Sequence, residues 1–359
     1  MLALFFIISC VAVGLIVYYV GVSGNSSSTS SSDPEPGAKA SVSKVRDVRL
    51  PTHLEPVNYK LELVPFIIPD NFTIRGQAEI QVTCHQPSRN ITLHAADITI
   101  DNDTVAVFDN DGNTMDVAKI SYDKDREFVI IHLGSPMSQD SDYFIKISYT
   151  AYLKDNLKGF YRSQYTDTRT NTTEYIAVTQ FQATDARRAF PCFDEPGIKA
   201  TYEVKLGRTR DMTSISNMPI VQEGIRMDGT KEYVWDVYQK SVKMSTYLVA
   251  FVVSKFKYVE ETRSNNVRFR IWSTPTSLDQ TQYAKDMGPK MLEFFENYFN
   301  VKFPLPKQDM IAIPDFGAGA MENWGLITYR LVTGYLELDL EPNMELDNIS
   351  YHLPCFGLV

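Results

Sequence analysis

The chain has 359 residues, of which 44% are hydrophobic and 22% are charged, a composition typical of globular protein with room for two domains. Its 35 Lys and Arg residues against 44 Asp and Glu residues give a formal net charge of -9 at pH 7. No basic stripe runs along the sequence, so the composition excludes nucleic acid as an expected partner.

The first segment, residues 1–22, contains no charged side chain. As a helix it would be about 30 Å long, which is the thickness of the apolar core of a bilayer. We therefore predict a transmembrane signal-anchor. A cleaved signal peptide is the alternative, although such peptides usually have a basic start and a shorter apolar region. The expected location is the plasma membrane, as a single-pass protein with a luminal or extracellular C-terminal body.

Residues 23–45 are rich in Ser, Pro and Gly, which favours an extended stalk over a folded domain. Six N-x-[ST] sequons follow the predicted span and fit glycosylation on the outer side of a membrane. Their asparagines are Asn25, Asn71, Asn90, Asn102, Asn171 and Asn348. The four cysteines (Cys10, Cys84, Cys192 and Cys355) show no disulfide spacing pattern, so we expect buried free thiols.

Residues 46–255 alternate between apolar and polar side chains with a period of two. In one run, Ile145, Ile147 and Tyr149 alternate with Lys146 and Ser148. Such alternation is typical of half-buried strands, and turn-forming clusters separate the runs. The pattern predicts a mainly β N-terminal domain over residues 46–255.

The pattern changes near residue 271 to that of a helix. Ser277 and Gln280 are spaced as a capping box. Apolar residues then recur every four positions, which predicts a helix that faces the core: Tyr283, Met287, Met291, Phe295 and Phe299. Pro289 lies inside this helix and is expected to bend it.

Six segments, taken together and in this order, resemble the aminopeptidase N family of membrane-anchored zinc aminopeptidases, which are gluzincin metallopeptidases. They are LPTHLEPVNYKLEL from Leu50, GFYRSQY from Gly159, TQFQATDARRAFPCFDEPGIKA from Thr179, SNMP from Ser216, MSTYLVAFVVSKF from Met244 and GAMENWGLITYR from Gly319. The resemblance implies a saddle-like β-sandwich at 46–255 and a truncated, thermolysin-like α/β domain at 256–330. Residues 331–359 diverge from the family pattern, so only its N-terminal part is present.

The GAMEN segment is the candidate site for the amino end of a peptide. If it forms an exposed edge strand, its small residues allow a substrate backbone to approach and pair. The resemblance implies that Glu322 binds the free α-ammonium and that Gln182 reaches the first substrate residue from the β domain. The expected substrate-binding residues are Gln182, Gly319, Ala320, Met321, Glu322 and Asn323.

A second charged cluster lies in TDARRAFPCFDEP. Its paired carboxylates suggest acid and base catalysis, but a structural network of acids and arginines that braces a domain boundary is the favoured interpretation. The cluster consists of Asp185, Arg187, Arg188, Asp194 and Glu195.

Peptide hydrolysis in this family implies zinc, which lowers the pKa of a bound water to about 7. The resemblance implies zinc ligands from the two histidines of H-E-x-x-H and a later Glu. No two of the five histidines stand four residues apart: His53, His85, His94, His132 and His352. Zinc is thus expected in the full-length family, whereas we expect no metal to bind this chain, which is predicted to be inactive alone.

Two interpretations of the chain stay open. It is either a fragment of a working aminopeptidase or a true short form, a catalytically dead cell-surface protein that binds peptides or partners. Peptide N-termini are the expected partners in both. The sequence leaves the residue preference and the oligomeric state undetermined.

Overall fold

The computed structural model describes residues 47–262 and 266–331. The described residues from Val48 onward belong to one compact unit. The predicted span (1–22), the stalk (23–45), nearly all of the tail (331–359) and two sequons, Asn25 and Asn348, lie outside the described residues. Among the residues described, no helix is both long and apolar enough to cross a bilayer.

The largest sheet forms because long alternating segments pair side by side. Every second residue of one central strand, from Ile74 to Cys84, is buried, and this strand pairs with its neighbour along its whole length. In spatial order the strands are β14 (Ile220–Arg226), β15 (Tyr233–Tyr238), β12 (Lys199–Thr209), β1 (Leu54–Pro65), β2 (Thr73–Cys84), β9 (Ser141–Tyr152), β5 (Ala106–Asp109) and β6 (Thr114–Met115), with β16 (Met244–Ser245) on β12 and β4 (Ile98–Ile100) on β9.

Two smaller sheets complete the β-rich part. One has the order β10 (Gly159–Asp167), β11 (Thr172–Gln180), β17 (Phe251–Ser254) and β13 (Thr213–Ser216). The other has the order β3 (Ser88–His94), β8 (Phe128–Met137) and β7 (Val117–Asp123). Short 3-10 turns connect the strands: η1 (Asn102–Thr104), η2 (Ala186–Arg188) and η3 (Thr246–Leu248). The predicted mainly β character of this region is confirmed.

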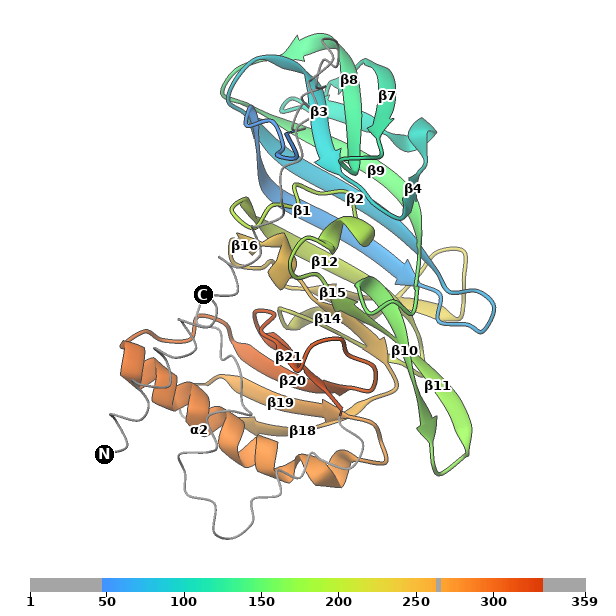
Figure 1. Cartoon of the computed structure of the whole chain (residues 1–359), viewed down its shortest axis with the longest axis vertical. Helices are drawn as coiled ribbons and strands as arrows, with labels where there is room; N and C mark the ends of the chain where they lie inside the picture. The colour runs from blue at the N-terminus through green and yellow to red at the C-terminus, as the bar shows by residue number, and fades with distance from the viewer. Residues whose placement is uncertain (1–46, 263–265, 332–359) are drawn as a thin grey trace, which may run out of the picture. The chain divides into compact units, whose positions relative to one another are not determined.

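A fourth sheet contains the GAMEN segment. Its order is β18 (Lys257–Thr262), β19 (Arg268–Ser273), β20 (Lys307–Ile313), β22 (Leu326–Arg330) and β21 (Ala320–Met321). The pairs β19–β20 and β20–β22 are parallel, and the outer pairs are antiparallel. After the turn η4 (Leu278–Thr281), the helix α2 (Gln282–Phe299) packs on β18 and β19 (Figure 1).

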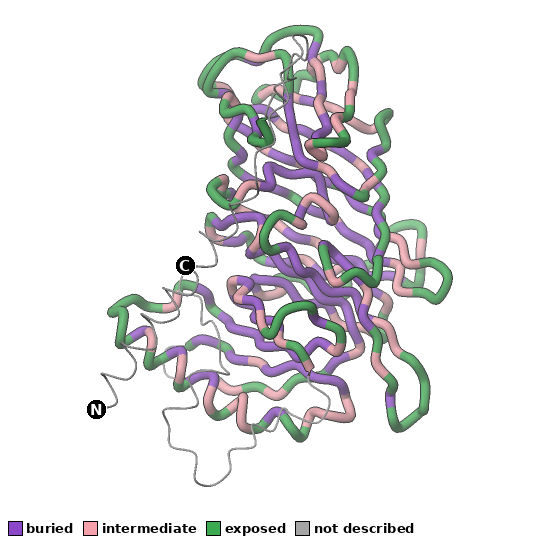
Figure 2. Tube along the Cα trace, in the orientation of Figure 1, coloured by how far each residue is buried: buried purple, intermediate pink, exposed green. Residues whose placement is uncertain are grey.

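One hydrophobic core joins the two regions. The cluster that contains Leu61, Ile80 and Phe251 of the β-rich part also contains Trp272 and Met321 of the GAMEN sheet. Figure 2 shows buried residues along the central strands and exposed ones at the hairpin tips. Cys84 and Cys192 are buried free thiols in this core, as expected. The sheet that bears GAMEN therefore shares its interior with the β-rich part.

The helix prediction needs two corrections. The residues of α2 that are buried are Gly288, Pro289, Leu292 and Glu296, and all but Pro289 come one position after a residue of the predicted stripe. The reason is close packing: a Cβ on Gly288 would lie 2.6 Å from the ring of Phe269, so the helix approaches the sheet at its glycine. The predicted capping box is also wrong, because Ser277 precedes η4 and its side chain makes no cap hydrogen bond.

Candidate functional site

The GAMEN segment lies at the edge of its sheet. Ala320 and Met321 pair with Tyr329 and Thr328 of β22 on one side, and β21 is the last strand in the sheet order of the described residues. The preceding Gly319 is exposed, and a Cβ built on it would have no atom within 4 Å. The edge thus has unpaired backbone groups and open space where a second strand could approach.

Glu322 follows directly after this edge strand. Its side chain is half-buried, and no hydrogen bond or ion pair of its carboxylate is found within residues 47–262 and 266–331. The chain then turns between Asn323 and Leu326, where the backbone N–H of Leu326 donates to the carbonyl of Asn323 at 2.9 Å. Gly325 has a φ of 82° at the third position, as a type II turn requires.

The side chains on both sides of Glu322 point inwards. Met321 is fully buried in the shared core. Asn323 is 1% exposed, and its amide donates to the carbonyl of Leu326 at 3.1 Å. Met321 and Asn323 thus fix the backbone on both sides of Glu322. Because their side chains are buried, only their backbone groups could contact a substrate. Their role in substrate binding stays a prediction.

The loop before β21 is fixed as well. The guanidinium of Arg330 donates to the carbonyls of Phe316, Gly317 and Ala318, and its backbone N–H donates to Gly319 at 3.0 Å. Sequence reasoning did not single out Arg330. It holds the approach to the GAMEN strand in one conformation.

Gln182 lies on the β-rich side, in the exposed turn that follows β11. The preceding Phe181 is fully buried and packs edge-to-face on Phe251, and the peptide bond between Gln182 and Ala183 is cis. No hydrogen bond between Gln182 and Glu322 is present in the described residues. The joint role of the two residues in substrate binding stays a prediction.

A buried charged group lies behind the turn. The ammonium of Lys307 is 2.6 Å from Oδ2 of Asp309, and Arg270 donates to both oxygens of Asp309 at 2.5 and 2.6 Å. Burial lowers the pKa of Lys307 to about 8, against the opposing effect of Asp309. Burial alone would raise the pKa of Asp309, but Lys307 and Arg270 together hold it below its ordinary value. Sequence reasoning missed this group.

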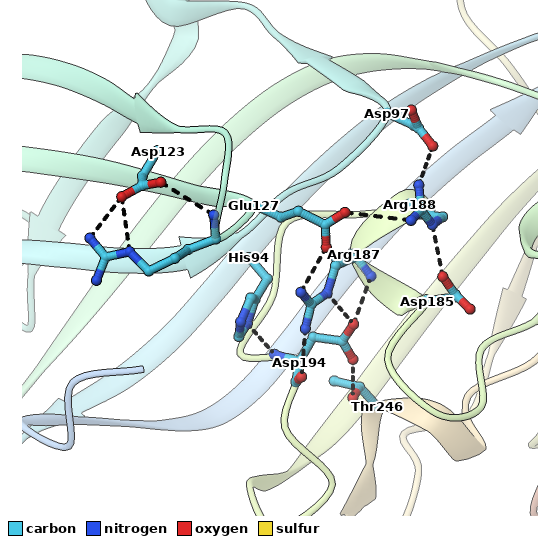
Figure 3. Close-up of polar contacts among 10 residues, drawn as sticks. His94, Asp97, Asp123, Glu127, Asp185, Arg187, Arg188, Asp194 and Thr246 are labelled. Carbon is cyan, nitrogen blue, oxygen red and sulfur yellow. Dashed lines mark hydrogen bonds and ion pairs between the residues drawn. The ribbon is translucent and has the colours of Figure 1, made fainter. Parts of the chain in front are cut away.

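The predicted network of acids and arginines is present (Figure 3). Arg187 binds Asp194 and Glu127 at 3.0 and 2.9 Å, and Arg188 binds Asp185 at 2.7 Å and also binds Glu127. The structural interpretation is supported by these contacts.

Its location differs from the prediction. Arg188 also binds Asp97, Asp194 accepts from the hydroxyl of Thr246, and Glu195 pairs with Arg49. All these partners lie between residues 49 and 246. The network braces the interior of the β-rich part, and the expectation that it spans a domain boundary is wrong.

Four sequons fall on described residues. Asn71, Asn90, Asn102 and Asn171 are all exposed. The side-chain carbonyl of Asn71 accepts from Thr73, and that of Asn102 accepts from Tyr122. Their surface positions are compatible with glycans, while glycosylation itself stays a prediction.

The described residues do not fit a zinc site. Within residues 47–262 and 266–331, no three His, Cys, Asp or Glu side chains gather as metal ligands would. His94 is buried beside Asp194, His85 pairs with Glu55 at the surface, and His132 bonds to Ser121.

Two pockets lie on or beside the β-rich part, and one of them is also lined by Asp315 from the loop between β20 and β21. One of about 380 Å³ is lined by Phe72, Arg162 and Asp315, among others. The other, of about 570 Å³, shares Phe72 and Arg162. Neither is lined by Gln182 or Glu322, so neither coincides with the candidate site.

Two protein-family models match this chain. Residues 55–248 match the peptidase M1 N-terminal domain, and residues 283–344 match the peptidase family M1 domain. The first match alone spans more than half of the chain. The β-rich part thus corresponds to the N-terminal domain of peptidase family M1, and nearly all of α2, with the strands β20, β21 and β22 of the GAMEN sheet that follow, falls in the match to the family M1 domain.

The chain belongs to peptidase family M1. It is 38% identical to aminopeptidase N of Bos taurus over 291 residues, which are 79% of this chain and 30% of that protein. It is 37% identical to endoplasmic reticulum aminopeptidase 1 of Rattus norvegicus over 317 residues, 88% of this chain and 33% of that protein. The puromycin-sensitive aminopeptidase of Caenorhabditis elegans is 38% identical over 286 residues, 80% of this chain and 29% of that protein. The chain spans about a third of the length of these relatives.

Proposed function

We propose that this chain binds the free amino end of peptides, with Glu322 as the group that pairs with the α-ammonium. The observation that best supports the proposal is the place of Glu322. It follows the edge strand β21, is half-buried, and has no partner among the described residues. In a longer protein of family M1, the same ion pair would position a peptide for removal of its N-terminal residue. The relatives' names, which are those of aminopeptidases, agree with this role.

The proposed mode of binding is strand addition. A peptide that pairs with the outer edge of β21 satisfies backbone groups that are otherwise solvated, and its first residue then reaches Glu322. The open space at Gly319 gives the peptide backbone room to approach. Gln182 is proposed to contact the first residue from the β-rich side.

The size of the effect follows from the burial of Glu322. A fully buried charge that loses its partner costs about 3–5 kcal/mol, whereas an exposed ion pair contributes about 0–1 kcal/mol. Glu322 lies between these limits. A contribution of about 1.4 kcal/mol corresponds to a tenfold preference for a free over a blocked amino end.

We further propose that the chain alone does not hydrolyse peptides. The sequence lacks the two histidines, four residues apart, that bind zinc in H-E-x-x-H, and this sequence observation supports the proposal. Zinc, where a longer M1 protein binds it, supplies the activated water. We also propose that residues 256–330 form the beginning of a thermolysin-like α/β domain.

The test compares an alanyl tetrapeptide with its N-acetylated form by isothermal titration calorimetry at pH 6.5, where the α-amine is protonated. We expect the full chain to bind the free peptide about tenfold more tightly. Glu322→Gln keeps the shape but removes the charge, and should bring the two affinities within about twofold of each other.

Glu203→Gln is the matched control, because Glu203 is also half-buried but lies on β12 of the large sheet. It should keep the preference of the unmodified chain. Equal affinity of the unmodified chain for both peptides would contradict the binding proposal. Chelator-sensitive turnover of an alanyl chromogenic substrate with added zinc would contradict the proposed inactivity.

For location, we propose a plasma-membrane protein whose residues 1–22 span the bilayer and whose body is outside. The support is the uncharged first segment and the surface position of the four described sequons. In transfected cells, endoglycosidase should reduce the apparent mass of the protein, and surface biotinylation should label it. A protein that stays unglycosylated and unlabelled in intact cells would contradict this proposal.

A further inference from the structure

Glu322 is useful as an anchor only if the turn behind it stays in one place. The side chain follows a strand of two residues, Ala320–Met321, which has few backbone hydrogen bonds of its own. The turn Asn323–Leu326 comes immediately after it. The groups that fix this turn therefore decide where the carboxylate of Glu322 lies.

We propose that Lys307, together with Asn217, is a positioning residue for the amino-end site, because the two side chains fasten the turn after Glu322 to the β-rich part of the molecule. This inference rests on the proposed function for its consequence, but the contacts that support it are independent of any substrate.

Lys307 makes the first connection. Its ammonium donates to the carbonyl of Gly325 in the turn at 2.8 Å and to the carbonyl of Ser216 at the end of β13 at 2.6 Å. The third contact of the ammonium is Asp309. Because the side chain of Lys307 is only 2% exposed, water cannot replace these contacts without opening the interface.

Asn217 makes the second connection from the β-rich side. Its amide group donates to the carbonyl of Trp324 at 2.9 Å and to that of Leu248 at 2.7 Å. Its side-chain oxygen accepts from the backbone N–H of Ala250 at 2.9 Å. All hydrogen-bonding atoms of a 3% exposed side chain are thus used, one of them on the turn.

Gly325 shows how closely the two parts meet. A Cβ at this position would lie 2.4 Å from the backbone carbonyl oxygen of Asn217. Its φ of 82° also disfavours other residues. The backbone N–H of Asp309 donates to the Gly325 carbonyl at 2.9 Å, so this oxygen accepts two hydrogen bonds. A side chain at position 325 would therefore collide with the backbone of the β-rich part.

The three tryptophans of the chain can report on local structure, because each lies in a different environment. Trp324 is in the turn, and the indole N–H of Trp272 donates to Asp309 at 3.2 Å. Trp235 packs in a separate small cluster with Val64 and Tyr233. Labelling with 5-fluorotryptophan and ¹⁹F NMR of the detergent-solubilised full chain can therefore separate a local change from a global one.

The first variant is Lys307→Met, which fills a similar volume without the charge. It leaves Asp309 paired with Arg270, so the buried group becomes neutral and the fold is expected to persist, which thermal unfolding checks. We expect the Trp324 resonance to shift or broaden while that of Trp235 stays unchanged. The preference for a free over an acetylated amino end should fall from about tenfold to about threefold or less.

The control is Lys60→Met, which removes the same charge from an exposed position on β1. It should change neither the Trp324 signal nor the peptide preference. Asn217→Ala is the second variant, and it decides the matter if Lys307→Met does not fold. It should shift Trp324 in the same manner.

A folded variant of either kind with an unshifted Trp324 resonance would overturn the inference. So would an undiminished tenfold preference in such a variant. If the unmodified chain shows no preference for a free amino end, the proposed function fails, and the Trp324 resonance still decides whether Lys307 and Asn217 hold the turn.

Discussion

At the scale of single residues, His94 shows how the interior controls a proton. The ring is 2% exposed, and its Nδ1 accepts a hydrogen bond from the backbone N–H of Asp194 at 3.2 Å. Burial, with the nearby charge of Arg187 as a second cause, lowers the pKa of His94 to about 3. The ring therefore stays neutral in the folded protein near neutral pH, because burial disfavours its charged form.

This shift makes stability depend on pH. The folded pKa of His94 is lower than its ordinary value of 6.5, so unfolding takes up a proton at any pH between these two values. Stabilisation present above pH 6.5 is therefore lost as the pH falls. Between pH 7 and pH 5, we expect the unmodified chain to lose about 2 kcal/mol more unfolding free energy than His94→Asn.

Urea unfolding followed by circular dichroism at the two pH values measures this difference. Asn retains an acceptor near the position of Nδ1, so the comparison isolates the titration from the hydrogen bond to Asp194. Gln86→Asn, at an exposed position that does not titrate, is the control and should lose as much stability between the two pH values as the unmodified chain. Parallel losses in His94→Asn and the unmodified chain would show that His94 is not the titrating group.

At the scale of elements, two substitutions in the helix α2 test which of its faces packs against the sheet. Leu292 is 4% exposed and packs with Phe269 and Met310 of the sheet, whereas Phe294 is 60% exposed. Leu292→Ala should therefore reduce the free energy of unfolding by about 2–4 kcal/mol. Phe294→Ala removes more atoms but should cost less than about 1 kcal/mol.

Denaturant unfolding of both variants provides the measurement. A larger loss for Phe294→Ala than for Leu292→Ala would mean that the helix packs through the face that carries Phe294 and not through the face that carries Leu292. The stripe was a reasonable prediction because a period of four identifies a helix well. It identified the wrong face because the close approach of Gly288 to Phe269, which sets the rotation of α2, is a tertiary contact.

The strands illustrate what a sequence pattern can and cannot predict. Alternation in β2 and β9 predicts half-buried strands correctly, because one face of their sheet is polar. In β20, by contrast, all residues from Lys307 to Ile313 are buried, although Lys307 and Asp309 are charged. Their burial depends on partners such as Arg270 and Ser216, which are distant in sequence. Local periodicity contains no information on those partners.

The candidate site shows the same division. The resemblance selected Glu322 and its neighbours, and the structure places them at a sheet edge. It did not reveal that Met321 and Asn323 point into the core, nor that Arg330 holds the preceding loop. Those facts depend on how the chain folds back through β22 onto the preceding loop, an arrangement that the letters of the motif do not describe.

At the scale of the whole molecule, the boundary between the predicted domains is less distinct in the packing than in the sequence. The proposed domains meet at residues 255 and 256, and a new sheet does begin at Lys257. Nevertheless, Trp272, Ile311 and Met321 lie in the same hydrophobic cluster as Phe251. Domain limits drawn from motifs stay a prediction, whereas the shared interior is a structural fact.

That shared interior limits how this protein could be recombined with its relatives. A chimera joined at residue 255 would pack the GAMEN sheet of one protein against the β-rich part of another, and would also have to restore the contact that Lys307 makes here with the carbonyl of Ser216. A substitution beneath the proposed amino-end site consequently has to be accommodated by side chains on both sides of residue 255.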